Sequence, residues 1–354
     1  MTLRKALILT AFTWVSAITA AHVRLNCAPV STWFASEKEK KMKIGFLPVT
    51  CHLTCPVTDF ITKEMDGEGL FQPVKFSGFP EIKESFLSGD LRATFILAPM
   101  AIALREQGVP IKIVYLGHRD GTALMVGKDS NIRSIRDLRG KTVAVPSRFA
   151  NQRLLIYKAL ADVGMSIKDV NLIEIPPPDM PAALYSKSVD AVTSGEPFMA
   201  QCELDGYGRV LYLTKDIWPN FISCVLAVNE AEIRDNPERI QKLVDGIAQS
   251  GMWLEGGMEN RQAAAQFVSK RYYGQHPRLL EYVLSKPPDR VRYTDLTLQR
   301  PNFEEIEKLA KESGIIKGNV TFDDYVDVRF GQKAAENMKA YDFKAAEALE
   351  ALKK

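Results

Sequence analysis

The sequence predicts an α/β protein in which short buried strands alternate with helices. Its 354 residues are 46% hydrophobic and 25% charged, a composition typical of globular domains rather than of disordered or fibrous chains. Short apolar runs recur along the chain, and a turn and then an amphipathic helix follow most of them. This alternation is typical of parallel sheets that helices cover on both faces. A chain of this length corresponds to about two domains of ordinary size.

Charge and cysteine content exclude several classes of protein. The formal net charge is only +3, and no stripe of lysine and arginine is interleaved with aromatic residues, so nucleic acid is not expected as a partner. Five cysteines are too few for a disulfide scaffold of this size, and no cluster has the paired spacing of a structural zinc site.

The first segment has the features of a secretory signal peptide. Arg4 and Lys5 precede an apolar run, residues 6–21, which ends in small residues. The run is shorter than the ~20 residues that a membrane-spanning helix needs, and a transmembrane anchor is the alternative interpretation. Cys27 follows Arg-Leu-Asn rather than the small residues of a lipoprotein cleavage site, so lipidation is not expected there.

We therefore expect residues 1–21 to be a signal peptide and residues 22–42 a linker. The mature amino terminus should lie between about residues 20 and 28. The mature chain is then soluble and exported to a compartment in which cysteines can pair.

Proline and glycine end most elements of the first half. The strand at 43–47 stops at Pro48, the helix at 81–88 closes at Gly89, and the strand at 93–97 runs to a turn at Pro99. The expected strands of this half are 43–47, 71–76, 93–97, 111–116 and 123–126. The expected helices are 56–65, 81–88 and 100–107.

A second unit starts near residue 130. Its strand at 142–145 stops at Pro146, its helix at 151–163 closes at Gly164, and a further strand runs into three consecutive prolines, which form a loop. The other expected strands are 171–175, 191–193, 210–213 and 221–229, and the other helices are 181–186 and 198–204. From residue 237 the chain is mostly helical, apart from an irregular proline-rich section at 286–290.

Candidate binding residues follow the strands, because ligands of open α/β sheets bind beyond the carboxyl ends of the strands. These residues are Thr50 and His52, Ala98 and Pro99, His118 and Arg119, and Ser147 and Arg148. Residues 147–151 lie between a strand and a helix, where free N–H groups and the helix dipole favour an anionic group. Ser147 as a simple helix cap and Arg148 as a solvated surface residue are the alternative interpretation.

Histidines and cysteines also gather after the strands. His52 and His118 follow strands of the same half, which favours a shared cleft. Cys51 and Cys55 flank His52 without a standard zinc spacing, so a disulfide or buried thiols are favoured over a metal. Two further cysteines, Cys202 and Cys224, either pair with each other or belong to the core.

No enzyme signature is present in the sequence. It contains no GxSxG elbow, no phosphate-binding P-loop, no HExxH and no GxGxxG after a strand. Their absence favours binding over catalysis, and no cofactor is expected. An exported enzyme that uses His52 and Glu196 as acid and base is the alternative.

Several phrases of the sequence resemble the periplasmic substrate-binding proteins of ABC importers. The phrases are Lys-Ile-Gly-Phe-Leu-Pro at 43–48, Leu-Ala-Pro-Met at 97–100, Asp-Leu-Arg-Gly-Lys-Thr-Val-Ala-Val at 137–145, Gly-Glu-Pro-Phe at 195–198 and Asp-Ile-Trp-Pro-Asn at 216–220. Within these proteins the chain is similar to the nitrate/sulfonate/taurine group, which is related to thiamine-precursor-binding (NMT1/THI5-like) proteins. The resemblance covers about residues 43–290.

This resemblance implies a two-lobed periplasmic-binding-protein fold of type II, with two crossover strands as the hinge. Lobe I would comprise 43–120 and 222–354, and lobe II 121–221. The lobes would close on a ligand, with Glu196 and Trp218 among the contacts, and a membrane permease and its ATPase would recognise the closed form. The protein would be a periplasmic monomer without catalytic residues.

The resemblance also bears on the ligand. In the nitrate and bicarbonate relatives, a lysine and a His-Pro-Glu-Lys run follow Asp-Ile-Trp, whereas here Pro219 and Asn220 follow Trp218. The lost positive charge favours a small anionic or polar organic solute over an inorganic anion. A thiamine-precursor-like pyrimidine, a sensory module and an exported enzyme of the same fold remain alternatives.

Overall fold

The computed structural model describes residues 14–16, 19, 41–67, 69–338, 347 and 350. Nearly all of the expected signal peptide and linker lies outside these residues. In the part of the chain that the structure describes, no helix is long and apolar enough to cross a membrane. Residues 1–41 and 42–354 are separate units, and the second one holds the fold described below.

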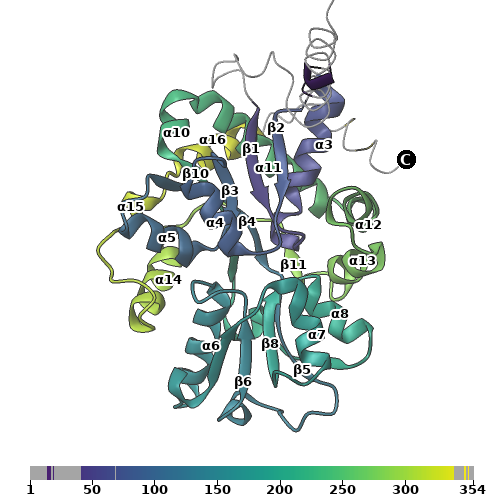
Figure 1. Ribbon diagram of the computed structural model, residues 1–354, viewed down its shortest axis with the longest axis vertical. Coiled ribbons are helices and arrows are strands. Elements are labelled where there is room, and N and C mark those ends of the chain that lie inside the picture. Colours follow the sequence, from purple (N-terminus) through teal and green to yellow (C-terminus); the bar gives the residue numbers. More distant parts are fainter. Residues whose placement is uncertain are drawn as a thin grey trace, which may run out of the picture. The chain divides into compact units, whose positions relative to one another are not determined.

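A six-stranded sheet forms the larger part of this unit, with the strand order β11-β4-β10-β3-β1-β2 (Figure 1). Strands β1, β2 and β3 run parallel, whereas β10 is antiparallel to β3 and β4, and β11 is antiparallel to β4. The strands are β1 (Met42–Phe46), β2 (Phe71–Lys75), β3 (Ala93–Ile96), β4 (Ile111–Asp120), β10 (Ile222–Asn229) and β11 (Val291–Arg292). We call this sheet and its helices lobe I.

A five-stranded sheet forms the second part, which we call lobe II, with the strand order β7-β6-β8-β5-β9. Its strands are β5 (Thr122–Gly127), β6 (Thr142–Val145), β7 (Asn171–Glu174), β8 (Ala191–Gly195) and β9 (Gly208–Leu213). Strands β6, β7 and β8 are parallel, but β5 is antiparallel to β8 and β9. The alternation of strands and helices indicated parallel strands, and the antiparallel pairing of β5 and β10 was not predicted. Strands β5 and β10 enter their sheets directly after the chain crosses between lobes, without the covering helix that returns a parallel strand.

Helices cover both sheets at the places where apolar residues recur with helical spacing. The helices of lobe I are α3 (Thr54–Asp66), α4 (Phe79–Leu87), α5 (Ala98–Glu106), α10 (Glu230–Asp235), α11 (Pro237–Glu255), α12 (Met258–Val268), α13 (Pro277–Ser285), α14 (Arg300–Glu312), α15 (Phe322–Tyr325) and α16 (Arg329–Asn337). Those of lobe II are α6 (Asn151–Asp162), α7 (Met180–Tyr185), α8 (Phe198–Leu204) and α9 (Thr214–Ile217).

Strand β5 illustrates how the sequence pattern builds the core. Ala123 and Met125 belong to the large apolar core that continues into lobe I, whereas Leu124 and Val126 belong to a second core on the other face of the sheet. Alternate side chains of a strand point to opposite faces, so a continuous apolar run is buried on both sides.

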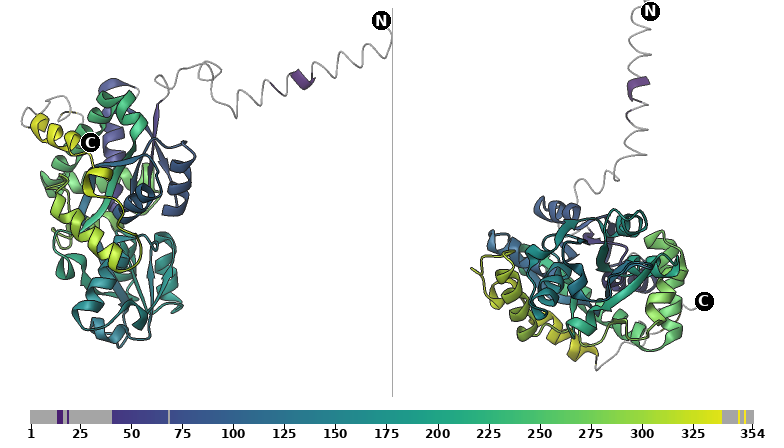
Figure 2. Two further views of the ribbon diagram at one scale, coloured as in Figure 1. Left: turned by 90° about the vertical axis from the view of Figure 1, so that its left-hand side faces the viewer. Right: turned by 90° about the horizontal axis from the view of Figure 1, so that it is seen from below.

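The lobes are connected at two crossings and held by helices. Asp120, the last residue of β4, and Gly121, which precedes β5, both have a left-handed backbone, with φ of 62° and 65°. A Cβ atom at Gly121 would lie 2.5 Å from the His118 ring, so this crossing requires glycine. From the carboxyl-terminal part, α14 packs against both α5 and α6, and α13 packs against α8. The later helices are the green and yellow ones in Figure 2.

Candidate functional site

The strand ends of the two lobes meet at one point. The backbone N–H of Thr50, in the 3₁₀ turn η1 (Thr50–His52) after β1, donates to the carbonyl oxygen of Glu196 after β8 at 2.8 Å. A Cβ atom at Gly195 would lie 3.9 Å from the Val49 side chain, so the residues beside this hydrogen bond are also near each other. Two segments that the sequence analysis selected separately therefore lie side by side, and we treat them as one candidate site.

Thr50 and His118 form the lobe I side of this site. The Thr50 hydroxyl lies 2.9 Å from Nε2 of His118, and the Thr50 carbonyl accepts a hydrogen bond from the Tyr293 hydroxyl at 2.8 Å. Burial lowers the pKa of His118 from 6.5 to about 4, with Cys51 opposing this shift and His52 adding to it. His118 is therefore a neutral, buried histidine at physiological pH.

His52 lies in the apolar interior of lobe I. Its ring is 5.2 Å from that of Phe95 and 6.2 Å from that of Phe79, measured between centroids. Its Nδ1 accepts the backbone N–H of Leu47 at 2.6 Å. In the neutral ring, Nε2 therefore carries the proton, and it has no protein partner. The acid–base pairing of His52 with Glu196 receives no support from these contacts.

Glu196 forms a buried ion pair that joins the lobes. Its carboxylate lies 2.5 Å from the guanidinium of Arg290, and the two side chains are 0% and 2% exposed. The other carboxylate oxygen accepts the backbone N–H of Ala200, and Arg290 also contacts Glu203 at 3.2 Å. Burial raises the pKa of Glu196 although Arg290 opposes this shift, and the two glutamates raise that of Arg290 against the effect of its own burial. The Glu196 side chain is thus engaged within the protein, and its role as a ligand contact stays a prediction.

Arg119 and Trp218 are also buried and have protein partners. Arg119 donates to the carbonyl oxygens of Asp295 at 2.7 Å and Asn220 at 2.9 Å. The Trp218 indole donates to the Glu305 carboxylate at 3.0 Å. These contacts stabilise the second crossing between the lobes, which lies between α9 and β10, and a ligand contact for either residue stays a prediction.

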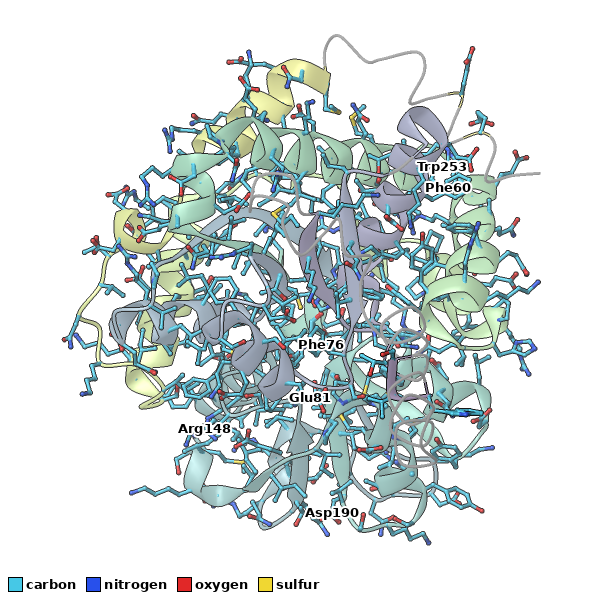
Figure 3. The ribbon with its side chains drawn as sticks, turned by 45° about the horizontal axis from the view of Figure 1, so that its top comes forward. Phe60, Phe76, Glu81, Arg148, Asp190 and Trp253 are labelled. Atoms are coloured by element: carbon cyan, nitrogen blue, oxygen red, sulfur yellow. The ribbon has the colours of Figure 1, made fainter. Side chains whose placement is uncertain are left out.

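The loop between β6 and α6 supplies the lobe II side. Ser147 is buried, and its hydroxyl accepts the N–H of Phe149 at 3.2 Å, so it stabilises the turn while Ala150 occupies the N-cap position. Arg148 is exposed, with its guanidinium 4.8 Å from the Phe149 ring centroid. In Figure 3, Arg148 lies below Phe76 and Glu81, which belong to lobe I. Among the ten predicted site residues, all of them described, only Arg148 is exposed.

Ala98 and Pro99 are the remaining predicted residues. They form the first turn of α5 and are buried. Only their backbone atoms and apolar side-chain atoms are available to contact a ligand.

Sequence reasoning missed a group of buried polar side chains near the crossings. Oxygen atoms of these side chains are buried without any protein partner, and the residues are Gln152, Thr193, Ser194 and Ser223. Buried polar groups are nearly always hydrogen-bonded, so these atoms are candidates for a ligand or for water. Ser194 is the penultimate residue of β8 and follows the strand expected at 191–193, so the rule that ligands bind beyond strand ends could have selected it.

The cysteines are all unpaired in the described part of the chain. Cys51, Cys55, Cys202 and Cys224 are buried free thiols. The structure thus contains neither of the disulfides considered from the sequence, Cys51–Cys55 and Cys202–Cys224. Instead Cys51 and Cys224 lie together, with their sulfur atoms 2.8 Å apart.

Two α/β lobes with two crossings, whose strand ends face each other, define a two-lobed binding-protein fold, as the sequence predicted. Residues 35–269 match the NMT1-like family, and the chain belongs to that family.

The curated relatives agree with this assignment. The chain is 24% identical over 73% of its length to the nitrate/nitrite binding protein NrtA of a Nostoc species, of which the match covers 62%. It is 32% identical over 40% of its length to the riboflavin-binding protein RibY of Chloroflexus aurantiacus, of which the match covers 40%. A match to the nitrate import ATP-binding protein NrtC of Synechococcus elongatus is 24% identical and covers 76% of this chain but 44% of NrtC. The chain thus spans less than two thirds of these relatives.

Solved structures show the same fold. The periplasmic nitrate-binding protein NrtA of Synechocystis superposes with a TM-score of 0.76 at 17% identity, covering 87% of this chain and 90% of NrtA. A ligand-binding component of an ABC-type import system from Staphylococcus aureus, with zinc bound, has a TM-score of 0.73 at 24% identity and covers 83% and 98%. The desulfurization enzyme DszB shares the fold at a TM-score of 0.60 and 16% identity, covering 84% and 99%. This fold therefore serves both binding proteins and an enzyme.

Proposed function

We propose that this chain is the periplasmic solute-binding component of an ABC importer. It captures a small polar organic solute between its lobes and delivers it to a permease and its ATPase. The observation that carries the proposal is the hydrogen bond between Thr50 of lobe I and Glu196 of lobe II. The buried polar atoms that have no protein partner lie near the same crossings. Relatives named as nitrate-, riboflavin- and alkanesulfonate-binding proteins support the class.

The charges near the crossings support a polar organic solute over an inorganic anion. Arg290 is neutralised by Glu196, Arg292 pairs with Asp120 at 2.7 Å, and Arg119 donates to two backbone carbonyls. These guanidinium groups are already used by the protein. The hydroxyl and amide groups near the crossings are therefore available to bind the solute. An anionic group of the solute would bind to Arg148 and to the amino terminus of α6.

Binding measurements on the purified chain test this proposal. Taurine, an alkanesulfonate, an aminopyrimidine, riboflavin and nitrate are compared by calorimetry and thermal unfolding, and we expect one of the organic solutes, not nitrate, to raise the melting temperature. Arg148→Ala and Ser194→Ala should each weaken binding of that solute by about 1–3 kcal/mol. Arg136→Ala, which removes an exposed arginine on the 3₁₀ turn η2 (Ile135–Leu138) of lobe II, is the matched control. Binding of nitrate alone, or unchanged affinity in both site variants, would contradict the proposal.

A distance measurement separates lobe closure from a rigid pocket. Leu87 in lobe I and Lys168 in lobe II are exposed, and Leu87→Cys with Lys168→Cys provides labelling sites, whereas the four described native cysteines are buried. A solute that contacts both lobes favours the closed form, so it should shorten the distance between the labels. An unchanged distance at saturating solute would support a single rigid domain.

Recovery of the solute distinguishes importer and enzyme. A binding protein releases its solute unchanged, whereas an enzyme of the same fold returns a product. A neighbouring permease and ATPase in the genome would favour import over a sensory module.

A further inference from the structure

Two buried cysteines from distant parts of lobe I lie side by side. Cys51 belongs to the turn after β1 and Cys224 to β10, 173 positions later, and their sulfur atoms are 2.8 Å apart. The two residues are 2% and 1% exposed. Unbonded sulfur atoms do not normally approach so closely. We propose that Cys51 and Cys224 form a disulfide in the exported protein, a covalent link that goes beyond the solute-binding function.

The backbone is arranged for such a link. A Cβ atom at Gly117 of β4 would lie 2.3 Å from the Cys51 carbonyl oxygen and 3.4 Å from that of Cys224. The turn after β1 and strand β10 therefore both lie against the same glycine of β4. Disulfides need Cα atoms within about 7 Å of each other, and a glycine at this position permits the close approach of the two segments.

The two thiols lie close enough to shift each other's pKa in opposite directions. Burial opposes ionisation of Cys51, yet a hydrogen bond with Cys224 and the nearby His52 lower the pKa of Cys51 well below its ordinary value. Burial and the same neighbour raise the pKa of Cys224 well above its ordinary value. A disulfide carries neither a charge nor a thiol proton, so it is compatible with this apolar interior.

A metal ion is the competing occupant. Ligand atoms of Cys51, His52 and Cys224 all lie within 4.8 Å of one another. However, Leu47 donates its N–H to Nδ1 of His52, which leaves Nε2 as a protonated donor rather than a metal ligand. The two sulfur atoms would also have to separate to bind one tetrahedral ion with Zn–S bonds of about 2.3 Å.

The oxidation is a thiol–disulfide exchange with a disulfide oxidant, either a protein or a small molecule. The thiolate of one cysteine attacks the oxidant, forms a mixed disulfide and releases one oxidant thiolate. The second cysteine loses its proton and attacks the mixed disulfide, which closes the Cys51–Cys224 bond and releases the second oxidant thiolate. Two electrons and two protons pass from the pair to the oxidant. Because the folded chain buries both sulfur atoms, this exchange takes place while the chain folds.

The link would hold part of the solute site. The turn that carries Cys51 also carries Thr50, whose N–H bonds Glu196 of lobe II. A bond to β10 fixes this turn to the centre of the six-stranded sheet, and closing a long loop restricts the unfolded chain. We expect the oxidised protein to melt at a higher temperature than the reduced protein.

Peptide mapping of the full chain, exported and then unfolded in an alkylating agent without reductant, tests the proposal. The expected product is one linked pair of peptides that contains Cys51 and Cys224, lighter by two hydrogen atoms than the separate peptides. Cys51→Ser or Cys224→Ser should abolish it, whereas the matched variants Cys55→Ser and Cys202→Ser should retain it. Reductant should lower the melting temperature of the wild-type protein and of Cys55→Ser, but not that of the Cys51→Ser/Cys224→Ser double variant.

Three results would overturn the proposal. The first is full alkylation of Cys51 and Cys224 in wild-type protein that was refolded with oxidised glutathione. The second is a linked peptide that contains a different cysteine pair. The third is stoichiometric zinc or copper in the native mass spectrum that Cys224→Ser removes. The wild-type peptide map decides the matter even where a variant fails to fold.

Discussion

His118 should make lobe I sensitive to mild acid. Its ring is buried against Thr50 and edge-on to Tyr293, at 5.7 Å between centroids, and burial lowers its pKa from 6.5 to about 4. Below pH 6.5 the unfolded chain takes up a proton that the folded protein accepts only near pH 4. The unfolded state is therefore stabilised as the pH falls through this interval, and folding stability decreases.

The size of the effect follows from the two pKa values. The pKa of His118 is 6.5 in the unfolded chain and about 4 in the folded protein. Proton linkage with these two pKa values predicts that the free energy of unfolding falls by roughly 2.5 kcal/mol between about pH 7.5 and pH 4.5. Nearby Cys51 raises the pKa of His118 while it is a thiolate, so oxidation of that cysteine would enlarge the loss. The predicted direction is the same in both redox states.

Urea unfolding at the two pH values measures this contribution. His118→Gln keeps a side chain that can bond Thr50 but does not titrate, so its loss of stability between the two pH values should be smaller than that of the wild type by about 2–3 kcal/mol. His276→Gln, at an exposed histidine, is the matched control and should behave like the wild type. Equal losses in His118→Gln and wild-type protein would refute the assignment of a buried neutral histidine.

Two further substitutions test the packing around the site. Arg290→Met leaves the buried Glu196 carboxylate without its main partner and should cost about 3–5 kcal/mol in urea unfolding, most of which the double variant with Glu196→Gln should recover. Arg300→Met, at an ion pair whose side chains are 47% and 75% exposed, should cost far less than Arg290→Met, and equal costs would contradict the argument. Gly117→Ala places a Cβ atom 2.3 Å from a backbone oxygen and should lower stability by about 1–3 kcal/mol in thermal unfolding, whereas Gly127→Ala, with its nearest neighbour at 3.9 Å, should change it by less than about 0.5 kcal/mol. A tolerated Gly117→Ala would mean that the turn after β1 can move away from β4.

The local elements were largely readable from the sequence. Strand β6 and helix α8 have the predicted bounds, 142–145 and 198–204, because proline or glycine lies beside them and their interiors are apolar. The phrases at strand ends also pointed to the segments after β1 and β8, which do meet across the lobes. Hydrophobic periodicity and turn residues are local properties, and they act within a few positions along the chain.

The partners of the buried polar groups were decided only by the tertiary structure. Glu196 was selected as a ligand contact, but Arg290, 94 positions away, occupies its carboxylate. A disulfide between Cys51 and Cys55 was considered from the sequence, yet the sulfur atom that lies beside Cys51 belongs to Cys224. The antiparallel entry of β5 and β10 was likewise not predicted. A periodic pattern specifies which face of an element is buried, whereas strand direction and pairing depend on how distant segments share one core. The amino-acid sequence by itself therefore determined the elements and the family, and the packing of two lobes across their crossings decided which side chains remain available to a solute.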